Sequence, residues 1–143
     1  MKSSLMRTMI AVAAVAVAAG TVSAQTLTAK IPMSFSVGDA KMAAGDYDIR
    51  IGNGNSATHV VYIYNRATRA AAVTMPFGSG DAPKAWLKDG SPRMSFACGS
   101  GHCTLTELWN GEGVSAYHFR SRELPAVEAR GMTTVTLALV KAR

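Results

Sequence analysis

The chain of 143 residues carries 15 lysines and arginines, 9 aspartates and glutamates, and 2 cysteines. This length allows one modest hydrophobic core and leaves no room for a second domain beside it. The positive excess is small and its basic residues are spread singly among other residue types, which argues against a nucleic-acid-binding surface. We therefore expect a single small domain whose partners do not include nucleic acid.

The first predicted element is a secretory signal peptide over residues 1–24. Two basic residues precede an apolar run from Met9 to Ala19, and the small residues of Val22-Ser23-Ala24 follow it. The run is shorter than the roughly 20 residues that a membrane-spanning helix needs, so cleavage is expected rather than anchoring. The mature chain, 25–143, keeps 13 basic and 9 acidic residues, a net charge of +4. We expect it to be exported to the periplasm or beyond, with no membrane span.

Alternating apolar and polar side chains predict strands through the first half of the mature chain. Lys30 to Val37 alternates throughout, and a proline within it favours a sheet edge or the start of pairing. Tyr47 to Ile51 alternates in the same way. His59 to Tyr64 is rich in β-branched and aromatic residues, which is typical of a strand covered on both faces. Small residues over Ala70 to Met75 predict a further strand.

Turn-forming residues divide the second half. Phe77 to Pro83 contains two glycines and a proline and predicts a flexible loop, which a short segment over Ala85 to Leu87 follows. Asn110-Gly111 predicts a two-residue type I′ turn, because both positions tolerate a positive φ, and Val114 to Arg120 then returns as a strand. Ser121 to Gly131 is predicted to be a loop. A last alternating strand runs from Met132 to Val140.

Both cysteines lie in a predicted hairpin between Pro92 and Gly113. Apolar and polar residues alternate on each arm, and Gly-Ser-Gly-His lies between the arms. Cys98 and Cys103 then face each other with Cα atoms roughly 4.5–5.5 Å apart, which is within disulfide range. The same register would place Glu107 on the apolar face. We therefore expect a bulge near Thr106-Glu107 that turns this carboxylate to solvent and returns Leu108 or Trp109 to the core.

Together these elements predict an all-β protein of eight or nine strands, arranged as an antiparallel β-sandwich or partly closed barrel. The motifs also resemble those of an uncharacterised family of small secreted all-β proteins that is frequent in acidobacteria. The similarity covers most of the mature length and rests on four segments: Ile31 to Gly38, Ala44-Gly45-Asp46-Tyr47, Met94 to Trp109, and Phe119-Arg120-Ser121-Arg122-Glu123. Met42-Ala43 stands where the family usually has Leu-Pro, and the cysteine pair where relatives often have polar and aromatic residues. The resemblance implies the fold and no known activity.

The cysteines, histidines and aspartates could in principle form a catalytic or metal-binding site, but their spacing gives little support for one. A thiolate beside His102 is a workable nucleophile, but two close cysteines in an exported chain form a disulfide more readily. The histidines His59, His102 and His118 do not match the ligand spacings of zinc sites. Asp46 and Asp48 share the outer face of a predicted strand, which suits calcium or glycosidase chemistry, although such carboxylates are usually only solvated. We predict no catalytic residue, no metal site and no cofactor.

Tyr62, Tyr64 and Trp86 form the candidate binding surface. Aromatic rings on a sheet present flat apolar surfaces with polar edges on which sugars stack, although core packing is the commoner use of such rings. Trp86 lies in an irregular stretch between a proline and a glycine, so we expect it to be the more exposed tryptophan and Trp109 the buried one.

We therefore expect a secreted or periplasmic non-enzymatic β-domain with a binding or cell-envelope structural role. The sequence does not identify its partner, for which a cell-envelope protein and a polysaccharide are the candidates. The alternative is a carbohydrate-active or thiol-dependent enzyme. The two differ in their surfaces, because an enzyme needs a concave cluster of titratable groups with perturbed pKa values, whereas a binding module needs a flat aromatic or edge-strand surface.

Overall fold

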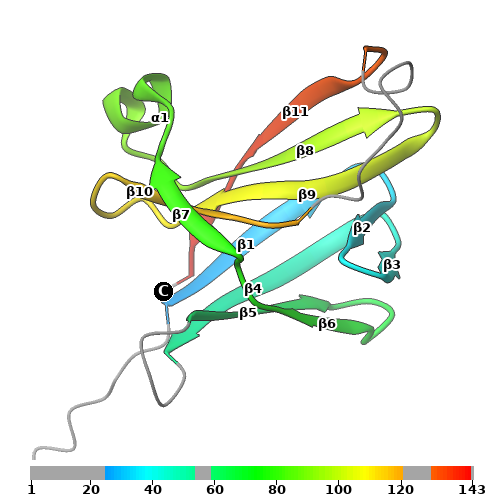
Figure 1. Ribbon diagram of the computed structural model, residues 1–143. Coiled ribbons are helices and arrows are strands. Elements are labelled where there is room, and N and C mark those ends of the chain that lie inside the picture. Colours follow the sequence, from blue (N-terminus) through cyan, green and yellow to red (C-terminus); the bar gives the residue numbers. More distant parts are fainter. Residues whose placement is uncertain (1–24, 54–58, 121–129, 143) are drawn as a thin grey trace, which may run out of the picture.

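The computed structural model describes residues 25–53, 59–120 and 130–142, in which the chain forms twelve strands and one short helix (Figure 1). The predicted signal peptide and nearly all of the loop predicted after Arg120 lie outside these residues. The strands form two sheets that pack as a sandwich, so this alternative of the predicted all-β class is confirmed. The number of strands is larger than the eight or nine expected.

The five-stranded sheet has its strands in the order β12, β1, β4, β5 and β6, all antiparallel. Their bounds are Val140–Lys141, Gln25–Ile31, Gly45–Asn53, His59–Asn65 and Ala71–Thr74. Apolar residues of these strands alternate with polar ones, so one face of the sheet is buried and the other faces solvent.

The seven-stranded sheet contains β11, β8, β9, β10 and β7 in that order, and β2 with β3 lies beside β9. The bounds of the first five are Thr133–Ala138, Arg93–Gly99, His102–Trp109, Ser115–His118 and Gly78–Asp81, and those of β2 and β3 are Phe35–Val37 and Ala40–Met42. Pairing is antiparallel except where β2 meets β9 at Ser36 and Thr104. The helix α1, Lys84–Asp89, covers part of this sheet (Figure 1).

The main core fills the space between the sheets. Phe35 lies at its centre, with its ring centroid 5.2 Å from those of both Tyr47 and Phe96 in edge-to-face contacts. Fully buried aliphatic side chains from both sheets surround these rings: Leu27, Ile31, Ile49, Val61, Ile63, Met94, Leu105 and Leu108. Burial of this apolar surface is the main contribution to the stability of the sandwich.

A second, smaller core lies on the outer face of the seven-stranded sheet. Leu108 and Trp109 are consecutive on β9 and so point to opposite faces, Leu108 into the main core and Trp109 under α1. There Trp109 packs with Trp86, Ala82 and Ala116. Gly90 ends the helix in a left-handed conformation with φ of 76°, and its N–H donates to the carbonyl oxygen of Trp86.

The cysteine hairpin forms as predicted. Cys98 and Cys103 pair across β8 and β9 and are joined by a disulfide, with Cα atoms 4.0 Å apart, which is closer than the roughly 4.5–5.5 Å expected. The expected bulge is also confirmed, because Ser95 pairs with Glu107 while Phe96 pairs with Leu105, which leaves Thr106 as the extra residue on β9. Beyond the bulge the side chains of Leu108 and Trp109 are 0% and 2% exposed.

The predicted strand from Lys30 to Val37 is wrong as a single element. β1 ends at Ile31 and belongs to the five-stranded sheet, whereas β2 begins at Phe35 and belongs to the other. Pro32, at the break, has no N–H with which to continue the ladder. The apolar residues on both sides of the break remain buried because the chain crosses the core as it changes sheets.

The strand predicted over His59 to Tyr64 is present as β5, but it is covered on one face only. Val61 and Ile63 are fully buried, whereas Tyr62 and Tyr64 are 47% and 39% exposed. The loop predicted over Phe77 to Pro83 is also wrong in part, because Gly78–Asp81 forms β7 and pairs with β10. The strand is formed by this pairing, since its own glycines and serine have little strand preference.

The two-residue turn predicted at Asn110-Gly111 is replaced by a longer loop from Asn110 to Val114. Gly111 and Gly113 take positive φ values of 82° and 64°, but Asn110 does not have a positive φ. Instead its side-chain oxygen Oδ1 accepts a hydrogen bond from the N–H of Glu112 at 3.0 Å. The asparagine therefore stabilises the turn through its side chain rather than through a left-handed backbone.

The C-terminal strands join the two sheets. β11 pairs with β8, and the N–H of Leu139 then donates to the carbonyl oxygen of Pro92 at 2.9 Å. The next residue, Val140, begins β12 and pairs with Thr28 of β1 in the other sheet. Leu139 is 3% exposed at this crossing. One continuous segment thus contributes an edge strand to each layer.

Candidate binding surfaces

The outer face of the five-stranded sheet carries two of the three residues predicted to bind. Strand register places Tyr62 between Arg50 of β4 and Val73 of β6, and Tyr64 between Asp48 and Ala71. All of these side chains point away from the core, because each alternates with a buried neighbour. We call the surface around Tyr62 and Tyr64 the tyrosine face.

Local contacts orient the tyrosine face. The ring atom Cε2 of Tyr62 lies 3.6 Å from the position that a Cβ atom would take on Gly52, so the ring lies over a site without a side chain. Beside Tyr64, the guanidinium of Arg66 donates to Oδ1 of Asp48 from Nε at 2.8 Å and from Nη2 at 2.6 Å. This pair lies at the surface, and it raises the pKa of Arg66 through the hydrogen bond to the carboxylate and through its charge.

Trp86 does not belong to this surface. Its side chain is 9% exposed and extends from α1 onto Trp109, on the outer face of the other sheet. The prediction that Trp86 is the exposed tryptophan is therefore wrong. Its flanking proline and glycine border a helix of six residues, and this helix turns the indole ring towards the sheet.

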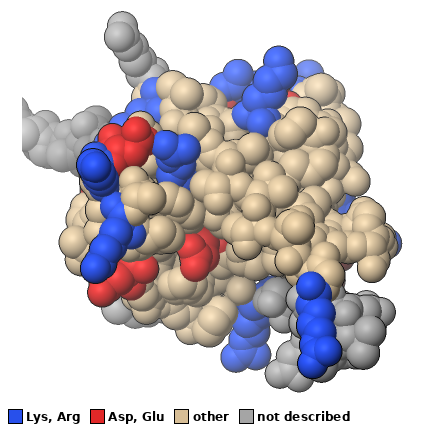
Figure 2. Space-filling model, turned by 90° about the horizontal axis from the view of Figure 1, so that it is seen from above, with Lys and Arg blue, Asp and Glu red and all other residues tan. Residues whose placement is uncertain are grey.

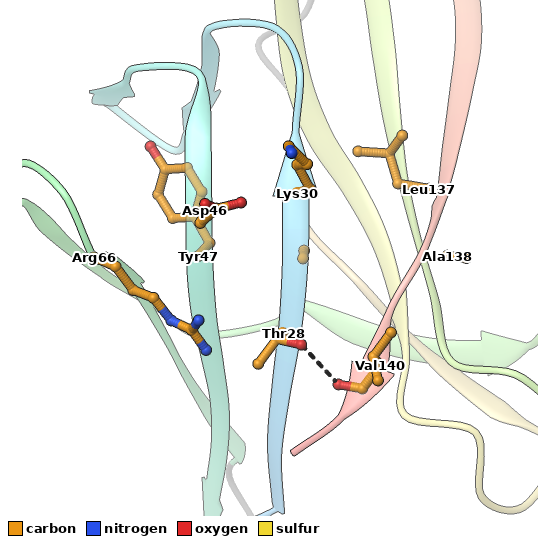
Figure 3. A pocket seen from close by; sticks show the side chains of 9 residues that line it. Thr28, Lys30, Asp46, Tyr47, Arg66, Leu137, Ala138 and Val140 are labelled. Carbon is orange, nitrogen blue, oxygen red and sulfur yellow. Dashed lines mark hydrogen bonds between the residues drawn. The ribbon is translucent and has the colours of Figure 1, made fainter.

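A hollow of about 300 Å³ lies beside the tyrosine face, where the C-terminal strands cross from one sheet to the other (Figure 3). β12 pairs only with Leu27 and Thr28, so among the described residues no strand covers the remainder of this edge of β1. Lys30, Asp46 and Arg66 lie over β1 and β4, while Leu137 and Val140 approach from the other side. Opposite charges thus share a shallow hollow.

A larger hollow of about 470 Å³ opens between the sheets near the start of β5, and we call it the inter-sheet cleft. Its lining comes from four separate segments: His59, Pro76 to Ser79, Ser115 and Tyr117. The rings of His59 and Tyr117 have centroids 5.0 Å apart and are tilted by 57°. Burial raises the pKa of the Tyr117 phenol, with a further contribution from the carboxylate of Glu112.

The sequence did not reveal this cleft, since one of its four segments, Pro76 to Ser79, lies almost entirely in the stretch predicted to be a loop. Ser79 faces the cleft because it pairs directly with Tyr117 across β7 and β10. The signal that would have found it is the strand pairing itself, which brings together residues about forty positions apart. At the rim, Phe77 is 61% exposed, and the Cζ atom of Arg120 lies 6.0 Å from the centre of its ring.

The residues considered for enzyme chemistry do not form one site. Cys98 and Cys103 are bonded to each other, so neither presents a thiolate to His102 at the exposed hairpin tip. Asp46 and Asp48 share the outer face of β4 as predicted, but Asp48 is paired with Arg66. Within residues 25–53, 59–120 and 130–142, no group of three or more His, Cys, Asp or Glu side chains is placed to hold a metal ion.

Charges are mixed on the surface of the seven-stranded sheet. Seen from the side of β8 and β11, basic and acidic side chains lie together at the margins, around a broad uncharged area (Figure 2). That view contains no continuous basic stripe of the kind that nucleic acid requires. In the described part of the chain, no helix has the length and apolar character to cross a membrane.

Comparison with known proteins finds no family model, no curated protein and no solved structure that matches this chain.

Proposed function

We propose that this protein is a non-enzymatic binding module of the cell envelope that holds a polysaccharide on its tyrosine face. The observation that carries the proposal is the position of Tyr62 and Tyr64, which are exposed side by side on the open face of one strand. Residues two apart on a strand are separated by roughly 6.6 Å, so the two rings offer neighbouring stacking positions. Among the described residues no element covers them.

The surroundings of the rings suit a sugar chain. The apolar face of a pyranose packs on an aromatic ring, while its hydroxyl groups need donors and acceptors at the edges. Arg50 lies beside Tyr62, and the Asp48–Arg66 pair lies beside Tyr64. Strand pairing fixes the backbone positions of Arg50 and Asp48, and the salt bridge restrains the side chains of Asp48 and Arg66.

Three further features favour a role outside the cytoplasm. The first 24 residues have the pattern of a secretory signal peptide. The disulfide is of a kind that persists in oxidising compartments. The family that the sequence motifs resemble consists of secreted proteins. A cell-envelope polysaccharide is thus a partner that the exported protein would meet.

The test is retention of the purified protein on insoluble peptidoglycan and its retardation in gels containing dextran, xylan or mannan. We expect binding to at least one of these polymers, and a fivefold to tenfold weakening in Tyr62→Ala and in Tyr64→Ala, because each ring contributes about 1 kcal/mol. Val114→Ala is the control, since it removes an exposed apolar side chain outside the tyrosine face. Binding that survives both tyrosine substitutions would refute the proposal, as would failure to bind any of these polymers.

A further inference from the structure

We infer that the inter-sheet cleft is a second binding site, which takes a single neutral sugar residue. Its volume of about 470 Å³ lies within the usual range for small-ligand sites. The cleft lies between the sheets, whereas the tyrosine face lies on the outer side of one of them. The inference is therefore independent of polysaccharide binding at that face.

The walls of the cleft match the two sides of a sugar ring. His59 and Tyr117 form an aromatic wall, with ring centroids 5.0 Å apart, and Pro76 with Phe77 adds apolar surface. Such rings accept the C–H face of a pyranose. Ser79 and Ser115 lie on the same side of β7 and β10 as Tyr117, so their hydroxyl groups are available to the equatorial hydroxyls of the ligand.

One polar atom of the cleft residues lacks a partner. Nδ1 of His59 is buried and has no hydrogen bond with any described residue. A buried polar atom of this kind is costly unless a partner satisfies it. This atom is closed to solvent, so a ligand in the cleft would meet the ring of His59 rather than Nδ1. The polar contacts of the cleft therefore come from the two serine hydroxyls.

The charge of the lining selects the class of sugar. Among the described residues that line the cleft, none is an aspartate, glutamate, lysine or arginine. Charged side chains lie around the lining: Arg120 is over Phe77, Glu112 acts on Tyr117, and Asp81 pairs with Ser115 across β7 and β10. The charge of a carboxylated or amino sugar would find no opposite charge among the residues that line the cleft. A neutral hexose therefore fits better than a uronic acid.

The chain offers a direct test by NMR, because it has only three histidines. D-glucose, D-galactose and D-mannose are each titrated while the imidazole signals are followed. We expect at least one of them to shift the His59 signal saturably, with a dissociation constant on the order of 1 mM for a ligand of about twelve non-hydrogen atoms. His118 and His102 serve as internal controls, because His118 points to the other face of β10 and His102 lies at the hairpin tip.

Substitutions then assign the site. Ser79→Ala and Ser115→Ala should each weaken binding about threefold to tenfold through loss of one hydrogen bond, whereas Ser34→Ala, at an exposed serine outside the cleft, should leave it unchanged. The Tyr62→Ala/Tyr64→Ala double variant should retain the His59 shift, which separates this site from the tyrosine face. The inference is overturned if none of the three hexoses shifts His59 up to about 100 times the expected constant, or if D-glucuronate binds more tightly. Equal binding by both serine variants and wild type would overturn it as well.

Discussion

Replacing both cysteines by serine measures what the Cys98–Cys103 disulfide contributes to stability. The cysteines are five positions apart, so the bridge closes a loop of about six residues in the unfolded chain. The chain-entropy treatment gives such a loop about 7 cal/mol/K, or about 2 kcal/mol at 25 °C. The native hairpin should persist without the bridge, because Ser100 and Gly101 form a two-residue turn in which both φ values, 52° and 78°, are positive.

The assay is urea unfolding of the double variant beside the wild type, with the wild type in reducing agent as a control. We expect both to lose about 2 kcal/mol, which is up to two fifths of the stability of a typical small domain, and the far-UV spectrum to stay the same. A loss above about 4 kcal/mol would contradict the reasoning, because the bridge would then maintain native packing. An unchanged midpoint and slope would contradict it too, since the bridge would then impose no constraint on the unfolded chain.

Three further predictions concern single side chains. In the two single-tryptophan proteins, acrylamide should quench the fluorescence of Trp86 and Trp109 weakly and to a similar extent, because both side chains are buried. Strong quenching of Trp86 alone would contradict its burial between α1 and the sheet. Asn65→Ala should cost about 2 kcal/mol in urea unfolding, since Oδ1 accepts hydrogen bonds from the N–H groups of Ala67 and Thr68 at 2.9 and 3.0 Å, and Asn110→Ala, which loses one exposed bond, should cost less. Equal losses of unfolding free energy in the two variants would contradict the larger contribution expected from the buried Asn65 side chain. Stability should fall as pH rises above about 10, the unfolded pKa of tyrosine, because the raised pKa of Tyr117 keeps its proton on the folded protein. Tyr117→Phe should reduce this fall in urea unfolding at high pH, and an unchanged fall would contradict the assignment to Tyr117.

Patterns that depend on neighbouring residues were predictable. The cysteine hairpin, its disulfide and its bulge follow from alternation on two adjacent arms and from one misplaced carboxylate. The exposure of Tyr62 and Tyr64 was not predictable in the same way. The composition of β5 suggested burial on both faces, but composition does not show that the outer face of this sheet lacks a covering layer.

Features that depend on distant pairing were not predictable. Alternation continues from Lys30 to Val37 because it records which side chains are buried and carries no information on which sheet buries them. Likewise, Gly78–Asp81 becomes a strand through β10, and Trp86 becomes buried through Trp109 of β9. The inter-sheet cleft depends on the pairing of β7 with β10 and on the approach of His59 from the other sheet, so no local sequence pattern predicts it.

The crossing of the C-terminal strands has a consequence for the order of folding. Thr28 and Val140 are hydrogen-bonded across 112 positions, and β8 receives its neighbour β11 from the same late segment. While a ribosome is still adding the preceding residues, the edges of β1 and β8 have no partner, and neither layer is complete. Contacts of such long sequence separation slow folding. A nascent chain built in this way stays open until the segment that forms β11 and β12 has been synthesised, which suits the proposed export, because a secretory channel carries unfolded polypeptide.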